Sequence, residues 1–442
     1  MRSVEGQLEF ILDLAKRGGA EADVILSQNR KLALKAHGKA VSDYTVASTR
    51  AVGVRVIRDG RVGTSYSETL DDEPIEYMVD QALNNARLTR ENPQEQISAI
   101  GHTIQTDHAD ILQTDNVSTQ EKVQAALRLE SGILEKKLAP TAPYNAVSDT
   151  EYEFYVANTK GAFCTHRERQ VSCYTSALID HDGQQSMHFS MQARRRFDAL
   201  DIEQCVDDAY ATAYDLLHGG PVATGTYAVI FDTDALKDIL SAFSAAFNGE
   251  SAMKGLNPLR DKIGQSVASP CFSLADVPDL PGGMSVASFD DEGFPAQRTS
   301  LITNGNLETL LHNSVTADHF GVANTANGSR GPKSGLGISS RHLQISAGQD
   351  RDPRSGEYLE IVSLQGTHSG ANAVTGNFSF GASGYRCRDG VRQEPVRGIT
   401  VASNFYEMLK RVDALGMTQE WSSDGTLYAP TMRFDACTIG GK

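Results

Sequence analysis

Three dipeptides in which Asp or Asn precedes Gly constrain this chain most strongly, because each lies among residues that alternate in strand fashion. They are Asp59-Gly60, Asp182-Gly183 and Asn304-Gly305. Such pairs adopt the positive φ angles that a two-residue type I′ turn requires, and these turns join antiparallel neighbours. The sequence therefore predicts β-hairpins in both halves of the chain.

Helical patterns separate the strand-like runs. Near the N-terminus, Leu8, Ile11 and Leu12 recur with the spacing of one helix face, and Ser118 with Glu121 has the form of a capping box. Residues 22–28 and 31–39 are predicted as two separate strands. Beyond the N-terminal one, the predicted helices are 72–88, 118–137, 201–217, 234–247 and 404–415.

The length of 442 residues is too great for one ordinary core. The run His218-Gly219-Gly220, followed by Pro221, ends a helical pattern and predicts a domain boundary. We expect an α+β N-terminal domain of helices and a strand meander over 1–220, with a sub-boundary near 91–117. A β-rich domain is expected over 221–442.

The balance of charge limits the classes of partner. The formal net charge is −15, which repels a phosphate backbone, so we predict no nucleic-acid partner. No apolar run reaches the length of a membrane span, so no membrane association is predicted. The six cysteines are scattered without a CxxC pair, which favours reduced thiols and a cytoplasmic location.

The C-terminal half carries a resemblance to a known family. Residues 288–331 read SFDDEGFPAQRTSLITNGNLETLLHNSVTADHFGVANTANGSRG, and residues 375–384 read TGNFSFGASG. Both resemble the C-terminal domain of the TldD/PmbA family, the "modulator of DNA gyrase" proteins, although Asn377 stands where an acid is usual. The resemblance implies a barrel-like C-terminal domain, and a family that pairs a zinc-peptidase subunit with a metal-free one.

The segment DALKDILSAFSAAFNGES, residues 234–251, decides between those two subunits. In the zinc-bearing branch a helix here carries His-Glu-x-x-x-His, in which imidazoles bind zinc and the Glu activates water. The resemblance places Leu240, Ser241 and Ala245 at the His, Glu and His positions. We therefore expect the metal-free PmbA/TldE-like branch, with no catalytic residue, no bound metal and no cofactor, and zinc only in a TldD-like partner.

Other polar residues are weaker candidates for a site. The resemblance and the small residues of segment 366–384 suggest a substrate cavity, or alternatively a tight turn without a ligand. Asp290, Asp291 and Glu292 could pair with Arg298 or a cationic substrate, but a solvated turn is favoured, and Cys437 is predicted to be a core thiol. The substrate-cavity candidates are His368, Ser369, Asn372, Thr375, Gly376 and Gly381.

Three functions follow from these patterns. The first is a metal-free, non-catalytic subunit of a cytosolic peptidase, inactive alone, that acts on peptides and unfolded segments as a heterodimer with a TldD-like zinc subunit or as a homodimer. The second is a self-sufficient hydrolase with an unrecognised site. The third is a peptide-binding or scaffolding homodimer. Metal analysis and a peptidase assay with and without the partner separate them.

Overall fold

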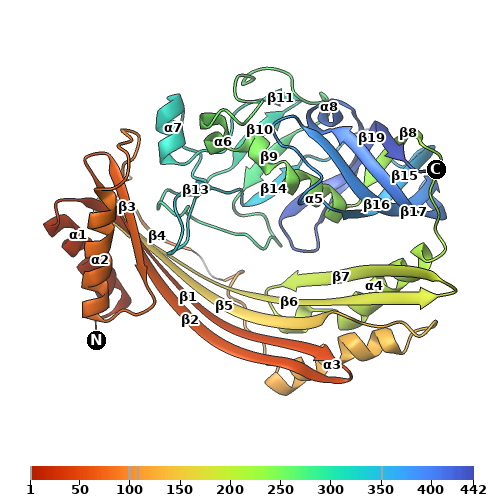
Figure 1. Cartoon of the computed structure of the whole chain (residues 1–442), viewed down its shortest axis with the longest axis horizontal. Helices are drawn as coiled ribbons and strands as arrows, with labels where there is room; N and C mark the ends of the chain where they lie inside the picture. The colour runs from red at the N-terminus through yellow and green to blue at the C-terminus, as the bar shows by residue number, and fades with distance from the viewer. Residues whose placement is uncertain (1, 98–100, 107–108, 350–351) are drawn as a thin grey trace.

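A computed structural model describes residues 2–97, 101–106, 109–349 and 352–442. It has two layers, a long curved N-terminal sheet and a β-rich C-terminal unit that lies over the concave side of that sheet (Figure 1). The predicted α+β class, with a mixed N-terminal half and a β-rich C-terminal half, is confirmed. In the described part of the chain, no helix combines the length and hydropathy that a membrane crossing requires.

The N-terminal sheet has the strand order β3-β2-β1-β5-β6-β4, and β7 pairs with β6 at an edge. The predicted hairpin turns at Asp59 and Asp182 are present, with φ angles of 52° and 50°. The expected sub-boundary near 91–117 includes residues 98–100 and 107–108, which lie outside the described residues. The strands are β1 (Glu21–His37), β2 (Ala40–Arg58), β3 (Arg61–Ser67), β4 (Thr103–Gln105), β5 (Asn145–Asn158), β6 (Phe163–His181) and β7 (Gln184–Arg194).

Strand β1 is a single strand of 17 residues, so the prediction of two strands over 22–28 and 31–39 was wrong. The polar residues between them continue both ladders, for example with Asn29 opposite Thr49 of β2 and Tyr152 of β5. Hydrogen bonding on both sides therefore holds this polar stretch extended despite its weak apolar pattern.

Four helices cover the convex face of this sheet. Leu8 and Ile11 of α1 pack with Val24 of β1, whereas Leu34 of β1 packs beneath α3 and α4. The predicted capping box is present, since the Ser118 side chain accepts a hydrogen bond from the Glu121 amide and the Glu121 carboxylate accepts one from the Ser118 amide. The helices are α1 (Val4–Arg17), α2 (Asp72–Ala86), α3 (Thr119–Leu134) and α4 (Ile202–Leu216).

The C-terminal unit is built on a ten-stranded sheet in which β19 pairs with both β17 and β8 and so closes a ring of strands. A large apolar cluster fills the unit, and the rings of Phe243 and Phe405 stack with their centroids 4.4 Å apart. Its elements are β8 (Gly225–Phe231), α5 (Thr233–Ala242), α6 (Gly249–Met253), β9 (Leu274–Val277), β10 (Thr299–Thr303), β11 (Asn306–Leu307), α7 (Ser314–Phe320), β12 (Gly328–Ser329), β13 (Gly337–Ile338), β14 (His342–Ile345), β15 (Glu357–Gln365), β16 (Asn377–Arg388), β17 (Val391–Asn404), α8 (Phe405–Lys410), β18 (Val412–Trp421) and β19 (Leu427–Gly440).

One predicted helix of this unit is too long. The sequence predicts a helix over 404–415, but α8 ends at Lys410 and β18 begins at Val412. Strand pairing overrides the helical pattern, because Val412 and Leu415 lie opposite Phe434 and Met432 of β19. The Asn304-Gly305 turn is present as predicted and joins β10 to β11.

Candidate functional site

Helix α5 occupies the position that the sequence singled out. It follows β8, and the Asp232 side chain caps its N-terminus by accepting a hydrogen bond from the Ala235 amide at 2.7 Å. The α-helix ends at Ala242 and continues as a 3-10 turn over Ser244–Phe247. Leu236, Ile239 and Phe243 are buried in the C-terminal core. Core packing therefore fixes this helix in place.

The chemistry of α5 does not fit the zinc that the resemblance assigns to the catalytic branch. Leu240 is buried in apolar surroundings, Ser241 is exposed and Ala245 is half-buried. An alkyl or methyl group cannot bind zinc, and a serine hydroxyl is a poor general base. Among the described residues, no group of three or more His, Cys, Asp or Glu side chains is placed to hold a metal ion.

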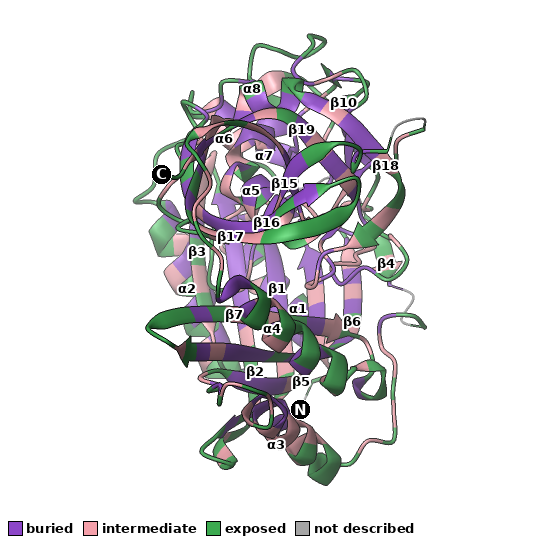
Figure 2. Cartoon of the chain, turned by 90° about the vertical axis from the view of Figure 1, so that its right-hand side faces the viewer, coloured by how far each residue is buried: buried purple, intermediate pink, exposed green. Residues whose placement is uncertain are grey.

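A large cleft lies between α5 and the N-terminal sheet, which we call the β7–α5 cleft. Its volume is about 1140 Å³. Figure 2 shows β7 and α4 below the ring of strands. Strand β7 and part of β6 form its floor. Its wall consists of the first turns of α5 and the end of β15, from Val362 to Gln365. The space is large enough for an extended peptide rather than only a small ligand.

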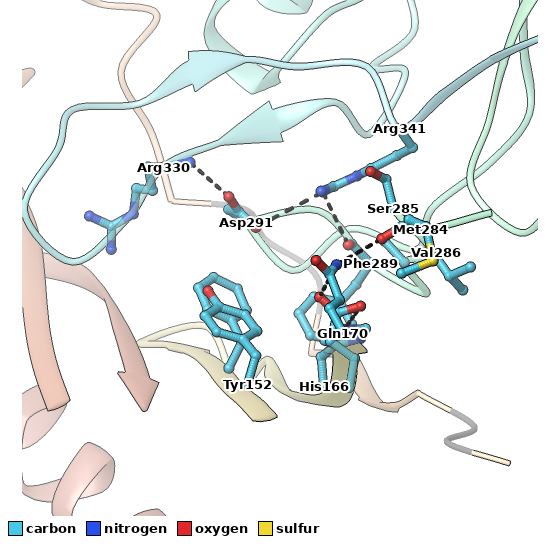
Figure 3. A pocket seen from close by; sticks show the side chains of 13 residues that line it. Tyr152, His166, Gln170, Met284, Ser285, Val286, Phe289, Asp291, Arg330 and Arg341 are labelled. Carbon is cyan, nitrogen blue, oxygen red and sulfur yellow. Dashed lines mark hydrogen bonds and ion pairs between the residues drawn. The ribbon is translucent and has the colours of Figure 1, made fainter. Parts of the chain in front are cut away.

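A smaller pocket of about 230 Å³ lies farther along the same layer boundary (Figure 3). Tyr152 and His166 line it from β5 and β6, while Phe289 and Arg341 line it from the C-terminal unit. The Gln170 side chain donates a hydrogen bond to a backbone carbonyl of that unit at 3.0 Å. Burial raises the pKa of Tyr152 to about 12.

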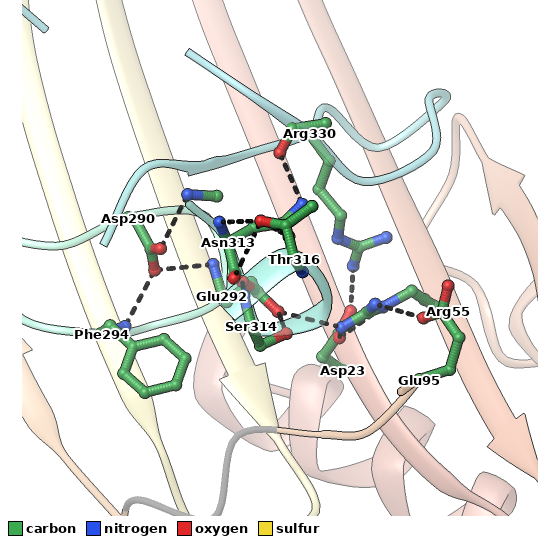
Figure 4. A network of polar contacts seen from close by, with 12 residues as sticks. Asp23, Arg55, Glu95, Asp290, Glu292, Phe294, Asn313, Ser314, Thr316 and Arg330 are labelled. Atoms are coloured by element: carbon green, nitrogen blue, oxygen red, sulfur yellow. Dashed lines mark hydrogen bonds and ion pairs between the residues drawn. The ribbon is translucent and has the colours of Figure 1, made fainter. Parts of the chain in front are cut away.

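Between these hollows and the far end of the sheet, a buried ionic cluster joins the two layers (Figure 4). We call Asp23, Arg55, Glu292 and Arg330 the Arg55 network. The Arg55 Nε donates to Asp23 Oδ2 at 2.8 Å, and its Nη2 lies 3.7 Å from Glu292 Oε1. Arg330 pairs with the other oxygen of Asp23. Burial by itself lowers the pKa of Arg55, but the Asp23 and Glu292 carboxylates raise it by more. The pKa of Arg55 therefore lies above its ordinary value, and the guanidinium stays charged.

The expectation that Asp290, Asp291 and Glu292 form a solvated turn was wrong. Asp290 is fully buried, and it accepts hydrogen bonds from the Phe294 and Gly328 amides, both at 2.9 Å. Glu292 accepts one from the Ser314 amide at 2.9 Å. These backbone donors, together with Arg55, replace water around the carboxylates.

Two further features of this junction were not read from the sequence. Arg298 does not pair with the carboxylates and donates instead to the Gln344 side chain at 2.7 Å. Gly53 of β2 allows the layers to approach, because a Cβ there would lie 1.8 Å from the Pro332 carbonyl oxygen. A charge at Arg55 within the apolar run of β2 was the sequence signal that could have indicated a buried ion pair.

The six substrate-cavity candidates lie in and beside a turn that connects β15 to β16. His368 and Ser369 are exposed at this turn. The Asn372 side chain accepts hydrogen bonds from the Val374 and Thr375 amides, both at 3.0 Å. Local hydrogen bonds therefore hold this segment, and its neighbour Gln365 reaches the β7–α5 cleft.

The two glycines of this set differ. Gly376 is buried with a φ of 81°, and a Cβ there would lie 2.4 Å from the Tyr406 ring. Gly381 is in β16 opposite Gln365, where the closest atom to a Cβ would be the Gln365 side-chain oxygen at 3.2 Å. Cys437 is fully buried, as predicted, and burial raises the pKa of its thiol to about 12.

The floor of the β7–α5 cleft was missed in the sequence. The run SMHFSMQ places Met187, Phe189 and Met191 at alternate positions, which is typical of a buried strand face. These side chains are instead between 38% and 48% exposed. The signal was present, but a sequence does not show which face of a strand another layer leaves uncovered.

Comparison with known proteins places these features in a family. Residues 22–86, 113–217 and 224–441 match domain 1, the central domain and the C-terminal domain of the PmbA/TldA metallopeptidases. A metalloprotease PmbA homologue from Haemophilus influenzae is 25% identical over 449 residues, covering 98% of this chain and 95% of that protein.

Two solved structures share the fold. A Thermotoga maritima protein described as a modulator of a DNA gyrase has a TM-score of 0.87 and 25% identity, covering 99% of this chain and all of that one. TldE from Thermococcus kodakarensis has a TM-score of 0.86 and 21% identity, covering 98% and 100% respectively. Because three successive domains match over most of its length, this chain belongs to the PmbA/TldA metallopeptidase family.

Proposed function

We propose that this chain is the metal-free, non-catalytic subunit of a two-part cytoplasmic peptidase that acts on peptides and unfolded segments. The observation that carries the proposal is the segment formed by α5 and the 3-10 turn after it. Leu240, Ser241 and Ala245 stand there at the positions that the resemblance assigns to the ligands and base of the zinc-bearing branch, yet α5 borders a large open cleft. In this proposal the chain contributes the cleft that binds the peptide, and a second subunit contributes the catalytic zinc and base.

The partner is a zinc-bearing member of the same family, or a second copy of this chain where that member is missing. A stable interface of this kind buries at least ~1,000 Å² in total. The C-terminal unit is proposed as the contact surface, with segment 366–384 near the shared cavity. Six unpaired cysteines, five of them buried, support a reducing compartment.

The test is reconstitution. The chain is mixed with the family member from the same organism that carries His-Glu-x-x-x-His, and complex formation is measured by size-exclusion chromatography with light scattering. Cleavage of an unstructured fluorogenic peptide is then measured for each protein and for the mixture. We expect cleavage by the mixture and none by this chain alone.

The matched control is a partner whose motif Glu is replaced by Gln, which keeps the fold but removes the base. Chelator-sensitive cleavage by this chain alone would instead favour a self-sufficient hydrolase. Self-association with peptide binding, and no cleavage in any mixture, would favour a scaffolding homodimer. Either result overturns the proposal.

A further inference from the structure

The floor of the β7–α5 cleft is an exposed apolar strip. Three cross-strand pairs on one face of the sheet form it, because β-paired residues point to the same side. These pairs are Tyr174 with Met191, Ser176 with Phe189, and Leu178 with Met187. The Tyr144 ring extends the strip, because it stacks on the Phe189 ring with the two centroids 6.0 Å apart. Contiguous exposed apolar side chains of this kind mark interaction sites on proteins.

The wall of the cleft has the opposite character. Asp232, Asp234 and Asp238 line it from α5 and the residue before it, and Asp208 of α4 also borders the cleft. Among the described residues that line the cleft, Lys237 alone carries a permanent positive charge, and it lies 3.2 Å from Asp238. The wall therefore has an excess of negative charge.

The acids of the wall are poorly compensated within the chain. Burial raises the pKa of Asp232 to about 7, and it also raises the pKa of Asp234. Lys237 also pairs with Asp424, outside the cleft, at 3.2 Å. Its charge is thus shared among acids of the protein itself, and a cation that entered the cleft would find carboxylates without a full partner.

The shape of the cleft favours an extended occupant. Strand β7 pairs with β6 on one side, and no second partner strand is found for it within the described residues. Opposite it, β15 pairs with β8 only from Leu359 to Ile361, which leaves the edge at 363–365 beside the cleft. An extended chain directs successive side chains to opposite sides, so it can place one set on the floor and the other against the wall.

We propose that the β7–α5 cleft binds an extended peptide in which basic residues alternate with apolar ones, the apolar side chains packing on β7 and the basic ones pairing with the aspartates of α5. This rests on the proposed function, in that the bound peptide is the substrate segment presented to the catalytic partner. The inference adds the chemical class of that substrate and the surface that selects it.

Binding to the isolated full chain is the first measurement. The probe is a short fluorescein-labelled peptide of alternating leucine and arginine, followed by fluorescence anisotropy. Two matched probes replace arginine by glutamine or by glutamate. We expect the arginine peptide to bind about tenfold more tightly than the glutamate peptide at low salt, with the difference shrinking as salt screens the charges.

Two sets of variants then assign the two surfaces. Asp234→Asn with Asp238→Asn is expected to weaken arginine-peptide binding about fivefold while leaving the glutamine peptide unchanged. Phe189→Ser is expected to weaken both peptides alike. The matched controls are Asp318→Asn on α7 and Met417→Ser on β18, which are exposed and lie outside the cleft. Unchanged melting temperatures confirm that the variants fold.

Equal affinity for the arginine and glutamate peptides, or wild-type binding by the double aspartate variant, would overturn the inference. The inference would also be overturned if Phe189→Ser abolished binding of the catalytic partner but left peptide affinity unchanged. The apolar strip would then be a surface that binds the other subunit. Peptide selectivity without cleavage in any mixture rejects only the proposed function. Cleavage by the mixture with no charge preference rejects only this inference.

Discussion

The two layers of the molecule meet differently in two places. In the Arg55 network, buried carboxylates pair with guanidinium groups. In the β7–α5 cleft, carboxylates of one layer face the apolar floor formed by the other. Asp23 and Arg55 are each 2% exposed, and Arg55 Nη2 lies 2.6 Å from Asp23 Oδ2. In the cleft, Asp234 accepts a hydrogen bond from the Ser423 amide at 2.8 Å, and the positive charge that acts on it is the Lys237 ammonium rather than a guanidinium.

The contrast shows how similar side chains serve different ends. A buried ion pair repays its desolvation only when every member is present, so it selects one docking geometry more than it adds stability. Acids at a hydrated cleft keep part of their water and can exchange it for a ligand. The network therefore joins the layers at one end, whereas near the cleft they meet through neutral partners, since Arg397 of β17 donates to the Gln185 carbonyl of β7.

The largest expected effect comes from breaking the network. Arg55→Met keeps most of the aliphatic stem, but it leaves Glu292 buried without its Arg55 partner and Asp23 paired with Arg330 alone. We expect a loss of about 3–5 kcal/mol in the free energy of unfolding, measured by chemical denaturation. The control is Arg128→Met, whose pairs with Glu135 and Glu203 are exposed and whose loss should cost less than about 1 kcal/mol. Equal losses for the two variants would contradict a rigid junction.

A smaller effect is expected at the turn beside the cleft. Gly376→Ala forces a side chain into a left-handed φ of 81° and against Tyr406, so we expect a loss of about 2 kcal/mol. Gly381→Ala should change stability by less than about 0.5 kcal/mol, because only the flexible end of Gln365 must move. If Gly381→Ala alters peptide binding at unchanged stability, segment 366–384 contributes to the cavity; if it does not, these glycines serve only the turn.

The pH dependence of stability distinguishes the two regions further. Burial raises the pKa of Asp232 to about 7, above its unfolded value, so its protonated form stabilises the folded chain at low pH. That contribution is fully present below the unfolded pKa and is lost as pH rises toward and through 7. Asp232→Asn keeps a capping oxygen for α5 and removes the titration.

The difference in unfolding free energy between Asp232→Asn and the wild-type chain should therefore grow in favour of the variant from about pH 4 to pH 8. Denaturation at a series of pH values measures it. Because the other carboxyl groups titrate in both proteins, they cancel in the difference. A difference that stays flat across this range would show that Asp232 is ordinarily hydrated and that the wall carries its full charge at lower pH.

Local signals in the sequence predicted much of the fold. The turn dipeptides, the capping box at Ser118 and the amphipathic helix positions depend on neighbouring residues, and the structure confirms them. The errors came from contacts distant in sequence. Ladders on both sides keep the polar middle of β1 extended, and β19 draws Val412–Leu415 out of a helix.

The candidate site was predicted less well for the same reason. The expectation that Leu240, Ser241 and Ala245 replace metal-binding residues rests on one segment and its resemblance to the family, so it needs only local sequence. Burial of Glu292 depends on Arg55, which lies more than 200 residues away in the chain, and exposure of Phe189 depends on where the C-terminal unit lies. No local pattern carries either fact.

The smallest expected effect is that of zinc on the stability of the chain, for which we predict no change. A site that binds the folded chain stabilises it by about 2.7 kcal/mol when the ligand is at 100 times its dissociation constant, and a chelator removes that gain. Because Leu240, Ser241 and Ala245 stand at the positions that the resemblance assigns to the zinc motif, neither added zinc nor a chelator should move the melting temperature, and elemental analysis should find no stoichiometric metal.

Replacing Leu240 and Ala245 by His would not create a peptidase, because Ser241 still lacks the carboxylate that deprotonates a metal-bound water. Leu240 is 2% exposed, so His at that position is also expected to destabilise the core. One tightly bound zinc ion per wild-type chain would contradict the metal-free assignment. It would also mean that residues other than Leu240, Ser241 and Ala245 bind the metal.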